Sequence, residues 1–219
     1  MREAASELFC PRQDDNSAAL VVSGNPQSPH VMLSIIIPTE GVEAPAVATL
    51  AALVPGAAAG IVREVLLIDG AGNGVIERVA DVAGCRFVSF QGSRPAALAT
   101  GARQARAPWL MFLRAGSVLD AGWIEETTQF IQSVAGSGRP RAGVFRYARS
   151  PYARVRFHDR LKSVMRIAAP ATDQGLLISR DHYFQLGGYL PHARRSEARF
   201  LRRLGRSSRI LLRSRIIVA

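Results

Sequence analysis

Four short apolar runs, separated by stretches with helical patterning, constrain the fold of this chain more than any other feature of its sequence. The apolar residues within each run are continuous rather than alternating with polar ones, which is typical of strands covered on both faces. The runs span residues 33–37, 65–68, 86–89 and 109–113. Helices are expected at residues 45–54, 74–82, 95–105 and 121–134. This alternation predicts an α/β fold with a mainly parallel central sheet flanked by helices.

The rest of the chain predicts a smaller C-terminal region beside that sheet and an appendage before it. Strands are expected at residues 143–147, 176–179 and 210–218, and helices at residues 154–167, 180–186 and 193–204. Residues 1–31 lack a long apolar run and are rich in proline, asparagine, serine and acidic residues, so they predict a disordered extension. In a chain of 219 residues, residues 32–219 are expected to form a single domain.

The uncharged stretch at residues 44–62 is long enough to span a bilayer. Alanine is its most frequent residue and it contains Pro55, Gly56 and Gly60, so it gains too little from apolar burial to stay in a membrane. We predict instead a helix that ends at a turn formed by Pro55 and Gly56. The two cysteines, Cys10 and Cys85, match no disulfide or metal-binding spacing, so we interpret both as reduced and predict a cytoplasmic protein.

Positive charge gathers in the last third of the chain. Residues 1–138 carry 9 basic and 13 acidic side chains, whereas residues 139–219 carry 19 basic and 4 acidic ones. Such a surface suits nucleotide phosphates or anionic lipid headgroups, and peripheral contact with the inner membrane face is one hypothesis. A solvated arginine-rich surface explains the same charge equally well. Nucleic acid is disfavoured as a partner, because the sequence offers little for it beyond charge. The aromatic residues Tyr147, Tyr152 and Phe157 interleave with arginines, but a core-facing role explains them at least as well.

The ends of the predicted strands are where a ligand is expected, because open parallel sheets bind ligands outside the carboxyl ends of their strands. These ends comprise residues 38–40, 69–74, 91–94 and 114–117. The glycine-rich end that begins at Asp69 does not fit a dinucleotide fingerprint, since the third glycine would fall at Val75. An acid at a strand tip beside a glycine-rich loop can still bind a nucleoside while backbone amides approach a phosphate.

Six segments of the chain resemble the family 2 glycosyltransferases in their order and spacing. They are Leu33-Ser34-Ile35-Ile36-Ile37-Pro38-Thr39-Glu40, Glu64-Val65-Leu66-Leu67-Ile68-Asp69-Gly70, Ser93-Arg94-Pro95 with Thr100-Gly101, Ala107-Pro108-Trp109-Leu110-Met111-Phe112-Leu113-Arg114-Ala115, Thr172-Asp173-Gln174-Gly175-Leu176-Leu177-Ile178-Ser179-Arg180 and Leu186-Gly187-Gly188-Tyr189. The resemblance implies a GT-A fold that binds a nucleoside diphosphate sugar. It also implies a nucleotide site lined by Pro38, Thr39, Glu40, Asp69 and Arg94.

The resemblance breaks down at the position where the family binds a divalent cation, Mg²⁺ or Mn²⁺. Family members carry an acid at the tip of the fourth strand, because the cation bridges the donor diphosphate. The corresponding residue here is Gly116, preceded by Arg114 and Ala115. No metal ligand is therefore predicted. Arginines such as Arg94 and Arg114 are expected to neutralise the diphosphate instead, since guanidinium groups suit bidentate phosphate contacts.

The positions implied for acceptor chemistry are only partly kept. The family's Glu-Asp pair, one member of which is the base that deprotonates the acceptor, aligns with Ala193 and Arg194. Glu197 is the nearest candidate base, and the alternative is a surface glutamate paired with neighbouring arginines. Asp173 and Gln174 keep the family's residue types, which implies contacts with sugar or acceptor hydroxyls, although an Asp before a strand also serves to close a turn.

These observations leave two functions open. The resemblance implies a protein that binds a nucleoside diphosphate sugar and, where it is active, transfers the sugar with inversion to an acceptor that the sequence does not identify. The alternative is a catalytically silent sugar-nucleotide-binding or interaction module, which explains the lost acids without any compensation.

Overall fold

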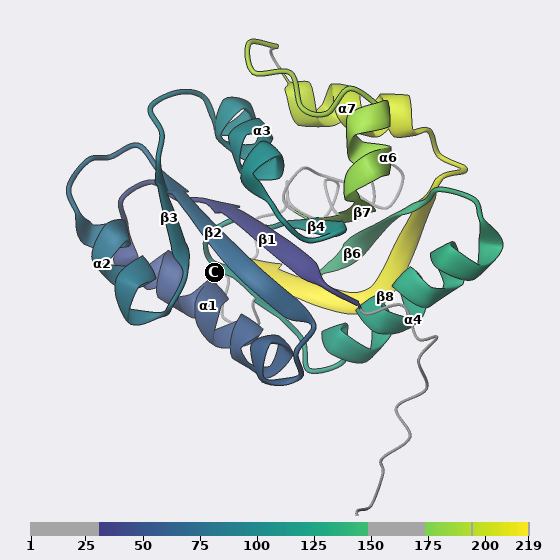
Figure 1. Cartoon of the computed structure of the whole chain (residues 1–219), viewed down its shortest axis with the longest axis horizontal. Helices are drawn as coiled ribbons and strands as arrows, with labels where there is room; N and C mark the ends of the chain where they lie inside the picture. The colour runs from purple at the N-terminus through teal and green to yellow at the C-terminus, as the bar shows by residue number, and fades with distance from the viewer. Residues whose placement is uncertain (1–30, 149–173, 194, 219) are drawn as a thin grey trace, which may run out of the picture.

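An eight-stranded mixed sheet with helices on both faces makes up the described part of the protein (Figure 1). The computed structural model describes residues 31–148, 174–193 and 195–218. The strand order is β3-β2-β1-β4-β7-β6-β8-β5. The strands are β1 Leu33–Pro38, β2 Val62–Asp69, β3 Arg86–Ser89, β4 Trp109–Phe112, β5 Ser117–Leu119, β6 Ala142–Ala148, β7 Leu176–Ser179 and β8 Arg209–Val218. Strands β3, β2, β1 and β4 are mutually parallel, whereas β7 runs antiparallel to both β4 and β6.

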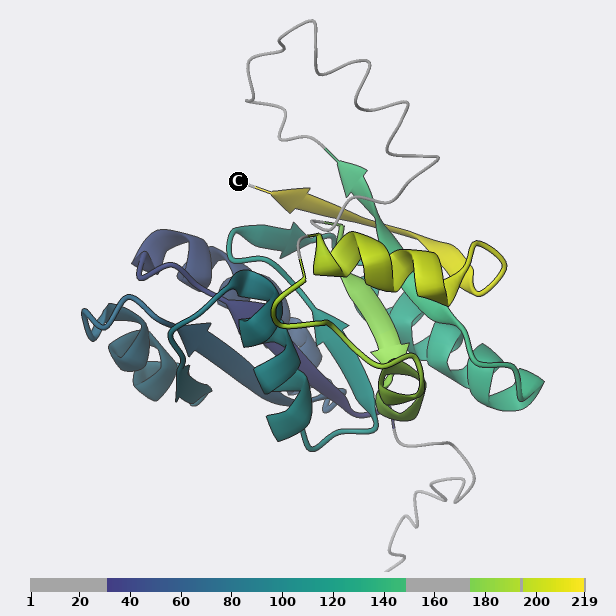
Figure 2. The same ribbon diagram turned by 90° about the horizontal axis from the view of Figure 1, so that it is seen from above.

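The helices form two layers. They are α1 Glu43–Ala58, α2 Val75–Val82, α3 Arg94–Gln104, α4 Trp123–Ser137, α6 Arg180–Gln185 and α7 Ser196–Leu204. Residues of α1, α2 and α4 pack in one apolar cluster, and residues of α3, α6 and α7 pack in a second one on the other face of the sheet. Figures 1 and 2 show α3, α6 and α7 together on that second face. Strand β1 contributes side chains to both clusters, with Ile35 in the first and Ile36 in the second. Burial on both faces therefore explains its continuous apolar run.

The fold confirms the predicted α/β class, and most predicted elements lie where they were expected. The predicted strands at residues 176–179 and 86–89 match β7 and β3. The short strand β5 was missed, because Ser117–Leu119 gains its strand pairing only from β8, about 100 residues away in sequence. The predicted helix at residues 154–167 and the predicted extension at residues 1–31, except Val31, lie outside the described residues.

The expected turn at Pro55 and Gly56 is wrong, since α1 runs through both residues to Ala58. Gly56 is buried, and a Cβ added there would lie 2.4 Å from Cη2 of Trp123. Packing of the last turn against this tryptophan outweighs the local preference of proline for ending a helix. The helix α7 also begins at Ser196 rather than at residue 193.

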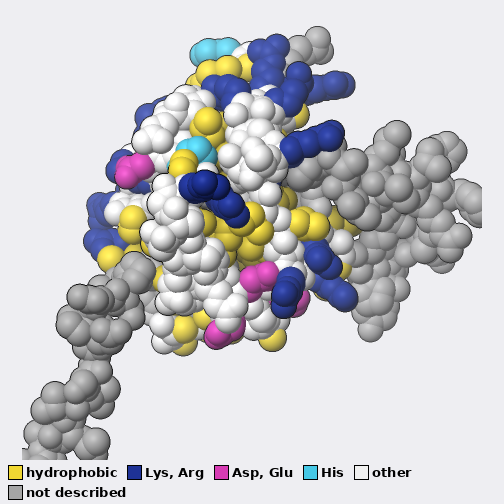
Figure 3. Space-filling view, turned by 90° about the vertical axis from the view of Figure 1, so that its right-hand side faces the viewer, with side chains coloured by type: hydrophobic (Ala, Val, Ile, Leu, Met, Phe, Trp, Pro, Cys, Tyr) yellow, Lys and Arg dark blue, Asp and Glu magenta, His cyan; other side chains and the backbone are white. Residues whose placement is uncertain are grey.

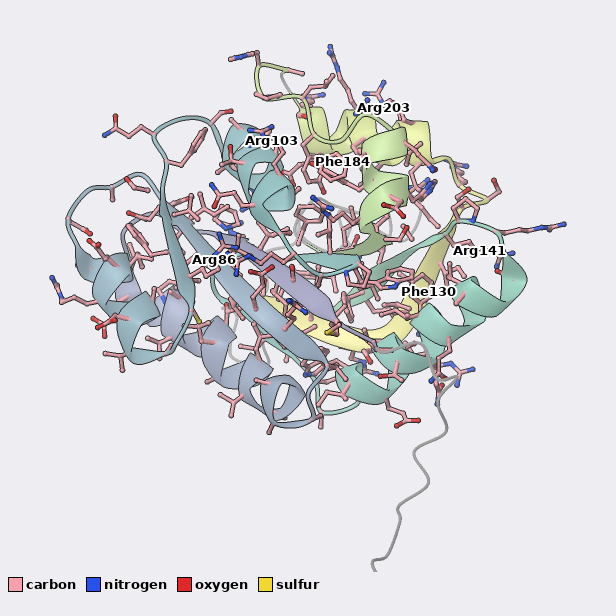
Figure 4. The ribbon with its side chains drawn as sticks, viewed as in Figure 1. Arg86, Arg103, Phe130, Arg141, Phe184 and Arg203 are labelled. Carbon is pink, nitrogen blue, oxygen red and sulfur yellow. The ribbon has the colours of Figure 1, made fainter. Side chains whose placement is uncertain are left out.

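A partly buried polar network ties the amino ends of the parallel strands together. Glu64 of β2 accepts hydrogen bonds from Ser34 Oγ (2.6 Å), from the backbone N–H of Arg106 (2.6 Å) and from Nη1 of Arg86 (2.9 Å). Arg86, labelled in Figure 4, also donates to the carbonyl oxygen of Gln104 at the end of α3. Burial of Glu64 raises its pKa, but these hydrogen bonds outweigh the burial and hold the pKa below its ordinary value.

Replacing Glu64 with glutamine is expected to lower the free energy of unfolding by about 1 to 2 kcal/mol at pH 7. Because the folded state lowers the pKa of this carboxyl group, its stabilisation is complete above the unfolded pKa, about 4.3, and is lost as the pH falls through the lower folded value. The difference between wild type and Glu64→Gln should therefore shrink between about pH 5 and pH 3. Urea titrations across this range measure it. The exposed Glu43→Gln variant is the control, and an equal pH trend in that variant would contradict the prediction.

Candidate functional site

A pocket of about 540 Å³ opens where β1, β2 and β3 end, at the edge where ligands bind in open parallel sheets. We call it the strand-end pocket. Its lining comprises Pro38, Thr39, Glu40, Ile68, Gly70, Ala71, Phe90, Gln91, Gly92, Arg94 and Ala97. The structure thus brings together four of the residues predicted from sequence, Pro38, Thr39, Glu40 and Arg94. Phe90 was not predicted from the sequence; it stands directly after β3 and contributes an aromatic wall.

Asp69 lies behind this pocket rather than in its lining. The residue is only 4% exposed. Its Oδ1 atom accepts hydrogen bonds from Thr39 Oγ1 (2.9 Å) and from the backbone N–H of Gly41 (2.7 Å), and its Oδ2 atom accepts one from the backbone N–H of Ala71 (2.9 Å). The carboxylate therefore fastens the loop after β1 to the loop after β2. Asp69 is not among the residues that line the pocket, and its contact with a nucleotide stays a prediction.

Arg94 stands at the start of α3 and is ion-paired with a residue far away in sequence. Ser93 caps the helix by accepting a hydrogen bond from the backbone N–H of Ala96 (3.4 Å). Nε of Arg94 lies 3.2 Å from Oε1 of Glu197, in the first turn of α7. The Glu197 side chain is 11% exposed and that of Arg94 is 31% exposed. Glu197 is therefore buried rather than at the surface, and one of its partners is Arg94 of α3.

Aromatic packing holds α7 in the position that this ion pair needs. Rings of Phe112, Tyr183, Tyr189 and Phe200 contact one another with centroids 5.1 to 5.5 Å apart. Tyr183 Oη accepts a hydrogen bond from the backbone N–H of Tyr189 (2.8 Å). Burial raises the pKa of Tyr189 well above 10, and the nearby Glu197 carboxylate adds to the rise. Strand β4, α6 and α7 are thereby joined by one aromatic cluster.

The residues at the expected metal position do not fit a divalent cation. Gly116 has a φ of 89°, and its backbone N–H donates to the carbonyl oxygen of Pro45 (2.8 Å) and to Thr49 Oγ1 (2.9 Å). This left-handed backbone conformation favours glycine over aspartate. Among the described residues, no three His, Cys, Asp or Glu side chains gather in a group that could hold a metal ion. Arg114 is exposed after β4 and does not line the strand-end pocket.

The remaining predicted residues lie elsewhere or outside the described part. Gln174 is buried in the turn that precedes β7, whereas Asp173 and Arg194 lie outside the described residues. Ala193 lines a second pocket of about 560 Å³, which shares Phe90, Gln91 and Gly92 with the strand-end pocket. The position aligned with the family's Glu-Asp pair therefore borders the site. Ala193, the residue of the aligned pair that the structure describes, carries no carboxylate.

A larger cavity of about 720 Å³ lies between α4 and β8, away from these residues. Its carboxylates cap the backbone of β8: Asp120 Oδ2 accepts from the N–H of Arg215 (2.9 Å), and Glu126 Oε2 accepts from the N–H of Ser214 (2.5 Å). These contacts satisfy backbone N–H groups of β8 just before the stretch that pairs with β5. We therefore place the candidate site in the strand-end pocket in spite of its smaller volume.

Arginine side chains gather on the face that carries α7. Figure 3, which views the molecule from the right of Figure 1, shows a group of Lys and Arg side chains at the top and others at the middle and lower right. Arg199, Arg202 and Arg203 of α7 are exposed. Arg203 is also bound to the protein, since its Nη2 atom donates to the carbonyl oxygen of Gly188 (2.5 Å). Within the described residues, no helix combines the length and hydropathy needed to cross a bilayer.

Comparisons with known proteins bear on the fold. No protein-family model matches this chain, and no curated protein matches it significantly. Solved structures do match it. S. aureus TarS, residues 1–349, superposes with a TM-score of 0.65 at 12% identity, over 86% of this chain and 60% of that one. The mannosyltransferase PcManGT from Pyrobaculum calidifontis, in complex with GDP-Man and Mn²⁺, gives a TM-score of 0.61 at 14% identity, over 85% and 56%.

The chain has a GT-A glycosyltransferase fold. It spans about three fifths of the length of either matched structure. At such low identity the likeness extends to the fold, and the function has to be argued from the residues of the site.

Proposed function

We propose that this protein binds a nucleoside diphosphate sugar in the strand-end pocket, with Arg94 facing the diphosphate. One observation carries the proposal: the pocket lies at the carboxyl ends of three parallel strands and gathers Pro38, Thr39, Glu40 and Arg94 there. The GDP-Man complex of a mannosyltransferase with the same fold supports this class of ligand.

The physical basis is charge and stacking rather than metal coordination. The guanidinium of Arg94 is charged at all physiological pH values and matches the geometry of phosphate oxygens. Phe90 offers an apolar wall on which a nucleobase can stack. The tip of β4 supplies Arg114 and Gly116 in place of acids, so the cation that would bridge a diphosphate has no carboxylate ligand at that tip.

The test is calorimetric titration of UDP, GDP and their sugar conjugates, with Mn²⁺ and with chelator. We expect the Kd of the preferred nucleotide to stay the same within about twofold in chelator, and Arg94→Ala to weaken binding at least about tenfold. Arg103→Ala is the matched control, since this exposed arginine is on the same helix and contacts Thr100. Failure of every nucleotide to bind, or binding that chelator abolishes, would overturn the proposal.

Transfer of the sugar is a separate question, and the site favours the catalytically silent alternative. A base is needed to accept the acceptor's proton, yet Ala193 stands at one of the aligned positions and Glu197 is ion-paired to Arg94. We therefore expect nucleotide binding without turnover when sugar nucleotides are incubated with the protein. Release of UDP or GDP above the background rate would support the transferase function with inversion instead.

A further inference from the structure

Two long-range contacts join the start of α3 to the segment before and within α7. Ser93 Oγ donates to the carbonyl oxygen of Pro191 (2.9 Å), and Nε of Arg94 lies 3.2 Å from Oε1 of Glu197. The paired residues are 98 and 103 positions apart in sequence. Arg94 is in the lining of the strand-end pocket, whereas Glu197 is not. Glu197 thus contacts the pocket through Arg94.

We propose that Glu197 is a positioning residue, which holds the guanidinium of Arg94 in the orientation that binds the diphosphate of a nucleotide. This inference rests on the proposed function of the strand-end pocket. It assigns to Glu197 a different role from the base that the sequence suggested.

The geometry of the ion pair supports this role. The contact engages Nε of Arg94, which leaves both Nη groups, at the end of the fork, to meet phosphate oxygens. A carboxylate on one edge of a guanidinium fixes the rotation of its plane, so less side-chain entropy is lost when a ligand binds. Supporting contacts of this kind hold a binding group within the narrow limits that recognition requires.

Burial makes Glu197 suited to orienting Arg94 and unsuited to accepting a proton from a bulky acceptor. Its side chain is 11% exposed and lies beside the buried Tyr189 ring. The aromatic cluster fixes α7, which carries Glu197 one turn before Phe200. Packing of α7 therefore fixes the backbone of Glu197, and the ion pair with Arg94 fixes its carboxylate.

The experiment compares two probes, a nucleoside diphosphate and the same nucleoside without phosphate, by calorimetry or ligand-observed NMR. We expect Glu197→Gln to weaken diphosphate binding about tenfold while the affinity for the nucleoside changes less than about twofold. In an Arg94→Ala background, Glu197→Gln should have no further effect. Glu125→Gln is the matched control, because it removes the same charge from the exposed start of α4.

A second variant keeps the test decisive where Glu197→Gln fails to fold. Arg94→Lys keeps the charge but lacks the fork that contacts Glu197 and phosphate together, so we expect it to lose diphosphate affinity about tenfold as well. Equal diphosphate affinity in Arg94→Lys and wild type would overturn the inference, as would Glu197→Gln weakening both probes alike. If wild type binds no nucleotide, the proposed function itself fails. If Arg94→Ala weakens binding and a folded Glu197→Gln does not, this inference alone fails.

Discussion

Replacing Asp69 with asparagine is expected to lower the free energy of unfolding by about 2 to 4 kcal/mol and to abolish nucleotide binding in the strand-end pocket. The carboxylate accepts three hydrogen bonds, from Thr39 Oγ1, Gly41 N–H and Ala71 N–H. An amide group has one oxygen, so its NH₂ group would face a backbone donor that has lost its acceptor. The loops after β1 and β2 would then separate, and the pocket wall would lose its shape.

Chemical denaturation and calorimetry together measure this effect. The control is Asp81→Asn on the exposed surface of α2, which should change the free energy of unfolding by less than about 0.5 kcal/mol. Wild-type stability in Asp69→Asn, combined with lost nucleotide binding, would contradict the structural role. That result would instead restore the direct nucleotide contact that the sequence resemblance implied.

The central sheet could be predicted because burial on both faces leaves a signature in local sequence. Strand β1 is apolar at successive positions, with Ile35 and Ile36 packing into opposite clusters. Strand β7 could be placed at its observed bounds for the same reason, and β3 could be placed as well although it is a half-buried edge strand. By contrast, β5 pairs with a strand far away in sequence, and the end of α1 depends on packing of Gly56 against Trp123. Local sequence propensity does not predict contacts between residues that are far apart in the chain.

The residues of the candidate site could be predicted to a similar extent, and the prediction was incomplete for similar reasons. The carboxyl ends of parallel strands meet at one edge, so Pro38, Glu40 and Arg94 could be grouped from their positions alone. The sequence could not show that Asp69 faces inward, because that depends on which backbone amides surround it. Nor could it show that Glu197 contacts Arg94, since that contact depends on packing of α7 beside α3, about 100 residues apart in sequence.

The close approach of α3 to the sheet leads to the second large effect. Gly101 lies against β1 and β2, and a Cβ added there would be 2.5 Å from Cγ2 of Ile36 and 2.6 Å from Cδ1 of Ile68. Both isoleucines are buried in a packed core, which does not yield easily. Gly101→Ala is therefore expected to destabilise the protein by about 1 to 3 kcal/mol, although alanine is the better helix former. Since α3 carries Arg94 at its start, nucleotide binding should weaken too.

The same substitution at Gly136 supplies the comparison that isolates this packing effect. Gly136 is in the exposed part of α4, and a Cβ there would meet no atom within 4 Å. Gly136→Ala should stabilise the protein by about 0.5 to 1 kcal/mol, because glycine loses more backbone entropy than alanine when a helix forms. Urea denaturation of the two variants should therefore give changes of opposite sign. Stabilisation by Gly101→Ala would mean that α3 lies farther from β1 and β2 than in this structure. It would also contradict the position of Arg94 in the lining of the strand-end pocket.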